Sequence, residues 1–189
     1  MKIIGKRLFR LTGVLVATLA WIIIFISMAQ NPWFVFTQHA FSDLGGPTAT
    51  NPWIFNYGLM VVSVLSVVYT IFLLQEATNK METLGGIFMV VASTFLALIG
   101  IYPSGTNPHT LVSIGFFLQF DLVIIAWGLG LLLRGLKGVG MLFSVIGILG
   151  PLAALTIEWP SIAIMETFGI LIIDLWVIIM IKVFRIAET

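Results

Sequence analysis

Long apolar runs alternate with short polar segments along the whole chain. The runs lie at about residues 8–28, 52–74, 84–102, 110–133, 139–157 and 161–181. Each is close to the roughly 20 apolar residues that a helix needs to cross a bilayer. No stretch shows the short alternating segments that are typical of membrane β-barrels. The pattern therefore predicts an all-α fold, a single integral membrane bundle of six transmembrane helices.

Composition points to lipid as the main solvent of this chain. Hydrophobic residues make up 60% of the sequence and charged residues only 9%, whereas soluble domains are about one-quarter charged. So few charges cannot cover a water-facing surface, and six spans leave no room for a separate soluble domain. We expect membrane lipid, and no nucleic acid, as the partner. The absence of cysteine from the sequence excludes disulfides and thiolate sites.

The basic residues predict the orientation of the bundle. All of them fall before the first span or after the second, fourth and sixth spans: Lys2, Lys6, Arg7, Arg10, Lys80, Arg134, Lys137, Lys182 and Arg185. A six-span path places these segments on one side of the membrane, which the positive-inside rule assigns to the cytoplasm. We therefore expect a multi-pass protein of the cell membrane with both termini cytoplasmic. The first apolar run is slightly long for a cleaved signal peptide, so we expect it to be retained.

A recurring turn pattern divides the spans into three αα-hairpins. Glycines occur early in the odd spans and prolines open the even spans: Gly13, Gly86 and Gly140, then Pro52, Pro108 and Pro160. Proline suits the first turn of a helix, where its missing N–H has no partner to lose. The hairpins are either copies of one unit or simply share a common turn. The first is longer than the others, because residues 30–51 form an inserted outer loop.

The inserted loop is rich in aromatic residues. Trp33, Phe36 and Phe41 lie in it, and it contains no lysine or arginine. Long loops in compact proteins are often functional. We expect this segment to lie at the outer interface or to fold back over the mouth of the bundle. The favoured function is therefore binding of a lipid or small apolar ligand in an outer-face pocket, with these aromatic side chains among its binding residues.

Two histidines and an aspartate suggest a second hypothesis. His39 and Asp43 are four residues apart and would share a face on a helical turn. With His109 they offer two nitrogens and an oxygen, enough for a catalytic divalent metal in a membrane hydrolase. The alternative is that Asp43 caps a turn and His109 fills the first turn of its span. Ser42 lies beside Asp43 and near His39, which suggests a serine nucleophile activated by a base. This hypothesis is weaker, because the sequence contains no nucleophile-elbow motif.

Three acids within the spans suggest a third hypothesis. Asp121, Glu166 and Asp174 have no lysine or arginine at a similar depth to pair with. Such acids are either functional, as in a proton- or cation-coupled transporter, or neutral groups that hydrogen-bond between helices. Three further acids read as solvated charges near basic residues at the cytoplasmic side, Glu76, Glu82 and Glu188, and Glu158 lies in the third outer turn.

Two short motifs carry a family resemblance. The first is His39-Ala-Phe-Ser-Asp-Leu-Gly45, followed by Asn51-Pro-x-x-Phe55-Asn56, and the second is Gly100-Ile-Tyr-Pro103, followed by His109. They resemble the motifs of domain-of-unknown-function 998, a family of six-helix prokaryotic membrane proteins. That family is similar in layout to Frag1/DRAM/Sfk1-type membrane proteins. The resemblance implies the six-helix fold and marks Ser42, Asp43, Gly45, Asn56, Pro103 and His109, but it implies no substrate.

Overall fold

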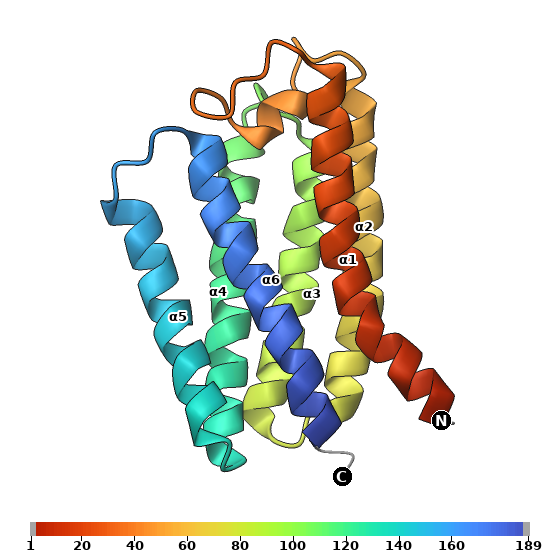
Figure 1. Ribbon diagram of the computed structural model, residues 1–189, viewed down its shortest axis with the longest axis vertical. Coiled ribbons are helices and arrows are strands. Elements are labelled where there is room, and N and C mark those ends of the chain that lie inside the picture. Colours follow the sequence, from red (N-terminus) through yellow and green to blue (C-terminus); the bar gives the residue numbers. More distant parts are fainter. Residues whose placement is uncertain (1–2, 187–189) are drawn as a thin grey trace.

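The computed structural model describes residues 3–186, with side chains from 11 to 184, so Lys2 and Glu188 lie outside it. Within this range the chain forms six long helices and one short 3-10 helix (Figure 1). They are α1 (Ile3–Gln30), η1 (Phe41–Gly45), α2 (Pro52–Glu76), α3 (Lys80–Ile101), α4 (His109–Leu133), α5 (Lys137–Thr156) and α6 (Ile162–Ile186). All six long helices are long and apolar enough to cross a membrane. The prediction of an all-α, multi-pass membrane bundle is confirmed.

The two ends of the bundle differ. The start of α1 and the end of α6 lie at one of them, the terminal end, whereas the long α1–α2 connection covers the other, the loop end (Figure 1). Pro52 occupies the first turn of α2 as expected. Asn79 caps α3 through hydrogen bonds from the N–H groups of Met81 and Glu82. Helices α2 and α3 therefore begin at residues that lack, or satisfy, the first N–H groups of a helix.

The third hairpin is open. Helix α5 packs along α4, whereas it meets α6 over a much shorter length. Gly128 and Gly140 permit the α4–α5 contact, because a Cβ on Gly128 would lie 3.0 Å from the Gly140 carbonyl oxygen, and one on Gly140 would lie 2.8 Å from that of Gly128. Small residues at such crossings let helix backbones approach closely. The result is a space between α5 and α6 that the first two hairpins do not have.

Large aromatic side chains fill the terminal half of the bundle. Tyr69, Phe72, Trp127, Trp176 and Phe184 are each at most 3% exposed. Several of these rings meet edge to face, such as Tyr69 with Trp176 and Trp127 with Phe184. Buried aromatic side chains packed in this way contribute strongly to a core. This half of the bundle is consequently closed, and the open space lies toward the loop end.

Glu82 is not the solvated charge that its sequence neighbourhood suggested. It is fully buried, and one carboxylate oxygen lies 3.6 Å from the Arg134 guanidinium. The other oxygen accepts hydrogen bonds from the N–H and hydroxyl groups of Thr78, at 2.6 and 3.0 Å. The sequence prediction was wrong because its arginine partner is remote along the chain, on the turn after α4. Tertiary packing brings the pair together at the terminal end.

Candidate functional site

The long connection between α1 and α2 folds back over the loop end of the bundle (Figure 1). Its aromatic residues differ in how far they are buried. Phe36 is exposed, whereas Phe41 is only 4% exposed and belongs to the apolar core beneath η1. Trp33 and Phe34 are half-buried and pack around His39. The loop is thus a folded cap on the bundle.

Asn31 anchors the start of this cap. Its side chain is 1% exposed and donates to the carbonyl oxygens of Ser27 and Thr50, at 2.8 and 3.2 Å. Its amide oxygen accepts from the N–H of Thr50 at 2.6 Å and from the indole of Trp33 at 3.0 Å. One side chain therefore joins the end of α1 to both ends of the loop.

The Ser-Asp-Leu-Gly motif lies in η1, and its last three residues make the contacts that hold the cap. The carboxylate of Asp43 accepts from the N–H of Ala40 at 2.9 Å and from the hydroxyl of Ser104 at 3.1 Å. Leu44 is fully buried. A Cβ on Gly45 would collide with the Asn56 amide, and that amide donates to the Gly45 carbonyl at 3.0 Å. The motif thus joins the cap to α2 and to the α3–α4 turn.

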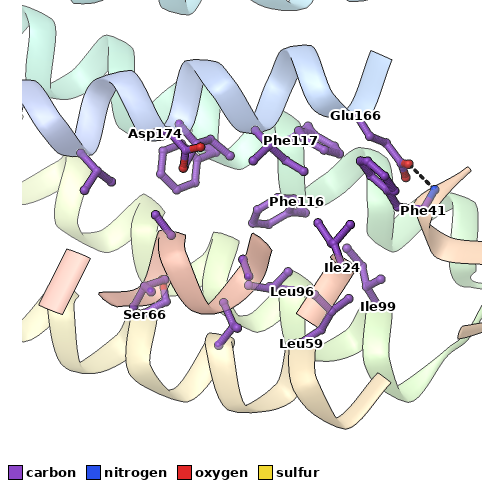
Figure 2. Close-up of a pocket in the computed structure, with 18 of the residues that line it drawn as sticks. Ile24, Phe41, Leu59, Ser66, Leu96, Ile99, Phe116, Phe117, Glu166 and Asp174 are labelled. Carbon is purple, nitrogen blue, oxygen red and sulfur yellow. Dashed lines mark hydrogen bonds between the residues drawn. The ribbon is translucent and has the colours of Figure 1, made fainter. Parts of the chain in front are cut away.

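Helix α6 holds the other side of the cap. The Glu166 carboxylate accepts from the N–H of Phe41 at 2.7 Å (Figure 2). The Ala163 N–H donates to the His39 carbonyl at 2.9 Å, and the Ser161 hydroxyl donates to the Phe36 carbonyl at 2.6 Å. These bonds satisfy backbone groups of the loop that would otherwise have no partner in an apolar setting.

The second motif ties the α3–α4 turn. Gly100 lets α3 approach α2 closely, because a Cβ there would collide with the Asn56 carbonyl. After the turn, Nδ1 of His109 lies 2.8 Å from the Tyr102 carbonyl oxygen. Since a carbonyl can only accept, Nδ1 carries the proton, and Nε2 faces the Ser113 hydroxyl at 3.4 Å. His109 closes its turn, as the structural alternative predicted.

The predicted metal site is not formed. Ala40 has an extended backbone, so His39 and Asp43 do not share a helical face. Nδ1 of His39 accepts from the Val35 N–H at 2.9 Å, while Asp43 and His109 bind the neighbours described above. Among the described residues, no three His, Asp or Glu side chains gather closely enough to hold a metal ion. Among the described residues, the Ser42 hydroxyl makes no hydrogen bond to a histidine or a carboxylate that could act as its base.

A small central cavity lies beneath the cap, with a volume of about 120 Å³. Figure 2 shows apolar side chains from several helices around it, together with Glu166 and Asp174. Asp174 lies in the wall and accepts a hydrogen bond from the Trp21 indole at 2.8 Å. This bond joins α1 to α6 and was missed from sequence, because tryptophan in an apolar run carries no sign of its partner.

A larger lateral cavity, of about 690 Å³, lies between α4, α5 and α6. Near the loop end its wall is polar: Ser42, Asp43, Ser104, Thr106, Asn107, His109, Ser113 and Glu166. Leu155, Ile162 and Met165 lie among these polar residues, and deeper in the bundle the wall is mostly apolar: Ile114, Phe117, Leu118, Phe120, Ile124, Phe168, Ile172 and Ile173. Leu155 is 81% exposed and Ile162 is 55% exposed. The cavity is therefore open to the side, where α5 and α6 diverge.

The remaining residues that the sequence singled out are spread over the cap and both cavities. Phe41 and Asp174 line the central cavity, Asp121 lines the lateral one, and Glu166 lines both. Trp33, Phe36 and Asn56 lie in neither wall and instead hold or cover the cap. Residues that the sequence did not single out, such as Ser104 and Ser113, also line the lateral cavity. Serine in a turn or a span is too common to have been selected from sequence.

The comparison with known families identifies the fold family. The family described as "Protein of unknown function (DUF998)" matches residues 14–181 of the chain. This protein belongs to that family. The match covers both motifs and nearly all of the six helices, which confirms the resemblance seen in the sequence. No curated protein and no solved structure matches the chain.

Proposed function

We propose that this DUF998 protein binds a lipid or another lipophilic molecule in its lateral cavity. The observation that carries this proposal is the cavity itself. Its volume of about 690 Å³ falls within the roughly 300–1,000 Å³ of ligand pockets. Its wall is polar at the loop end and apolar below, which matches an amphiphilic molecule. The side opening between α5 and α6 provides a route from the bilayer without passage through water.

The proposal includes an orientation, with the loop end outside the cell and both termini in the cytoplasm. The basic residues whose side chains are described, Lys80, Arg134, Lys137 and Lys182, all belong to the terminal end. The positive-inside rule places this end in the cytoplasm of a cell membrane. The polar mouth of the cavity would then lie in the outer leaflet.

Because the sequence contains no cysteine, single-cysteine labelling tests this orientation directly. Gln38→Cys lies on the exposed part of the cap, and Gly138→Cys lies at the terminal end, where a Cβ meets no other atom within 4 Å. A membrane-impermeant maleimide should label Gln38→Cys in intact cells. It should label Gly138→Cys only after permeabilisation. The opposite pattern would place the cap in the cytoplasm.

A bulky side chain in the lateral cavity should prevent ligand binding. Ala154 on α5 lines this cavity, and Ala154→Phe would place a ring where an apolar chain would lie. We expect saturable binding of tritiated decanol to protein in zwitterionic-lipid nanodiscs, after subtraction of binding to empty nanodiscs. Ala154→Phe should weaken this binding by about tenfold or more, since the ring takes up ligand volume.

The matched control is Leu152→Phe on the same helix. Leu152 is 51% exposed and lies outside the cavity wall, so this variant adds a similar ring facing lipid. It should bind decanol as the wild type does. The proposal fails if wild-type binding is not saturable, or if both variants bind equally. Thermal unfolding of both variants checks that Ala154→Phe leaves the bundle folded.

The other two hypotheses receive less support. A metal-dependent hydrolase needs the three-ligand group that His39, Asp43 and His109 do not form. A coupled transporter would use Asp121, Glu166 and Asp174, but the bundle beyond Asp174 is filled by the large buried side chains Tyr69, Trp127 and Trp176. Binding from the side, rather than passage through the bundle, is the function that the packing favours.

A further inference from the structure

One carboxyl group in the lateral cavity has no hydrogen-bond or ion-pair partner among the residues that the structure describes. The other two acids in its wall both accept hydrogen bonds: Asp43 from the Ala40 N–H and the Ser104 hydroxyl, and Glu166 from the Phe41 N–H. Asp174, in the central cavity, accepts one from Trp21. Asp121 is half-buried on α4, and no group in the described chain donates to it. A carboxyl group within a span is costly unless it is paired, so Asp121 differs from the acids that serve the packing.

Asp121 lies deep in the membrane. It is twelve residues after His109, the first residue of α4, which corresponds to about 18 Å along a helix. The hydrocarbon core of a bilayer is about 30 Å thick, so this carboxyl group is near its middle. Water-facing headgroups of ordinary lipids lie well above this depth. A polar group that meets Asp121 must therefore be carried inward by a largely apolar molecule.

The fold leaves space at this carboxyl group. Gly150 on α5 faces it, and a Cβ there would lie 3.7 Å from its Oδ1 oxygen. Pro151, next in α5, also lines the cavity. A Cβ would touch the carboxyl group only by ordinary van der Waals contact, and a longer side chain at this position would take up space beside it. Around it the wall is apolar, with Phe120, Ile124 and Ile172.

The charged residues that line the cavity favour a ligand group with a positive charge. Its titratable wall residues are Asp43, Asp121, Glu166 and His109, and its described lining contains no lysine or arginine. A ligand carboxylate or phosphate would meet like charges in a setting of low dielectric. An ammonium group would instead donate charge-assisted hydrogen bonds to Asp121, which are stronger than bonds between neutral groups.

We propose that the ligand of the lateral cavity is a lipophilic amine, whose nitrogen pairs with the Asp121 carboxyl group while its apolar part fills the wall. This inference rests on the proposed function and adds the chemical class of the ligand. Asp121 recognises the amine, and the polar mouth with Asp43 and Glu166 favours the entry of cations over anions. The cap keeps its own bonds throughout.

Three tritiated probes with the same chain length test whether the ligand is an amine. They are decylamine, decanol and decanoate, each measured in the nanodisc assay described above. Binding to empty nanodiscs is subtracted for each probe, which removes differences in partitioning. Wild-type protein should bind decylamine about tenfold more tightly than decanol, and decanoate more weakly than either. Decanol binding equal to or tighter than decylamine binding would overturn the inference, even if Asp121→Asn did not fold.

The variants locate the recognition. In Asp121→Asn the ratio of decylamine to decanol affinity should fall to near one, with decanol binding retained. Asp174→Asn, the same change in the other cavity, should keep the wild-type ratio. An unchanged ratio in Asp121→Asn, or an equal loss in Asp174→Asn, would refute a role for Asp121. Saturable decanol binding distinguishes failure of the amine inference from failure of the proposed function. If the wild type binds decanol saturably but shows no preference for decylamine, only the amine inference fails. If the wild type does not bind decanol saturably, the proposed function itself fails.

Discussion

Arg134→Met should lower the stability of the bundle by about 3 kcal/mol, because it leaves the buried Glu82 carboxylate without its counter-charge. Glu82 is fully buried, while Arg134 is 19% exposed and lies 3.6 Å away. Removing one partner of a buried ion pair typically costs about 3–5 kcal/mol. We expect the low end of that range since water reaches the arginine. The measurement is unfolding of the purified protein in a fixed detergent, by heat and by denaturant.

Lys137→Met is the matched control, since this basic residue is exposed at the start of α5, three residues after Arg134. It should change stability by less than about 0.5 kcal/mol. The double variant Arg134→Met with Glu82→Met should be more stable than Arg134→Met alone, because no charge is left buried and unpaired. Equal losses in Arg134→Met and Lys137→Met would show that the ion pair contributes nothing to stability.

Asn31→Ala should detach the cap from α1. The change removes two donated and two accepted hydrogen bonds at a side chain that is 1% exposed. Each buried polar group left without a partner costs about 1–3 kcal/mol. We expect a total loss of about 2–4 kcal/mol, since water will satisfy some of these groups once the loop moves. Hydrogen exchange of residues 31–51 should rise strongly while exchange in α3 and α4 changes little.

Gln38→Ala serves as the control for Asn31→Ala. Gln38 lies on the exposed part of the same loop, so its truncation should leave both stability and exchange of the loop at wild-type values. If Asn31→Ala leaves exchange of residues 31–51 unchanged, the bonds of Asn31 are not what holds the cap. The bonds from η1 to Glu166 and Asn56 would then carry that role.

The short family motifs predicted part of the site. They marked Asp43, Gly45, Asn56 and His109, and the structure shows for each a contact that explains its residue type. Their role was less predictable. His39 and Asp43 were expected to meet on one helical face, but the extended backbone at Ala40 separates them. A spacing of four residues predicts a shared face only where the helix is continuous.

By itself, the sequence determined that this is a six-helix membrane protein, because apolar runs of spanning length and sparse charge depend only on local composition. It also located the inserted loop and the acids within the spans. Only the tertiary structure decided which acids have partners, since the donors to Asp174 and Glu166 come from α1 and the cap, more than a hundred residues away. The open third hairpin was likewise beyond the sequence. It depends on how the Gly128–Gly140 contact sets α5 against α4. It creates the cavity in which Asp121 has no partner among the described residues.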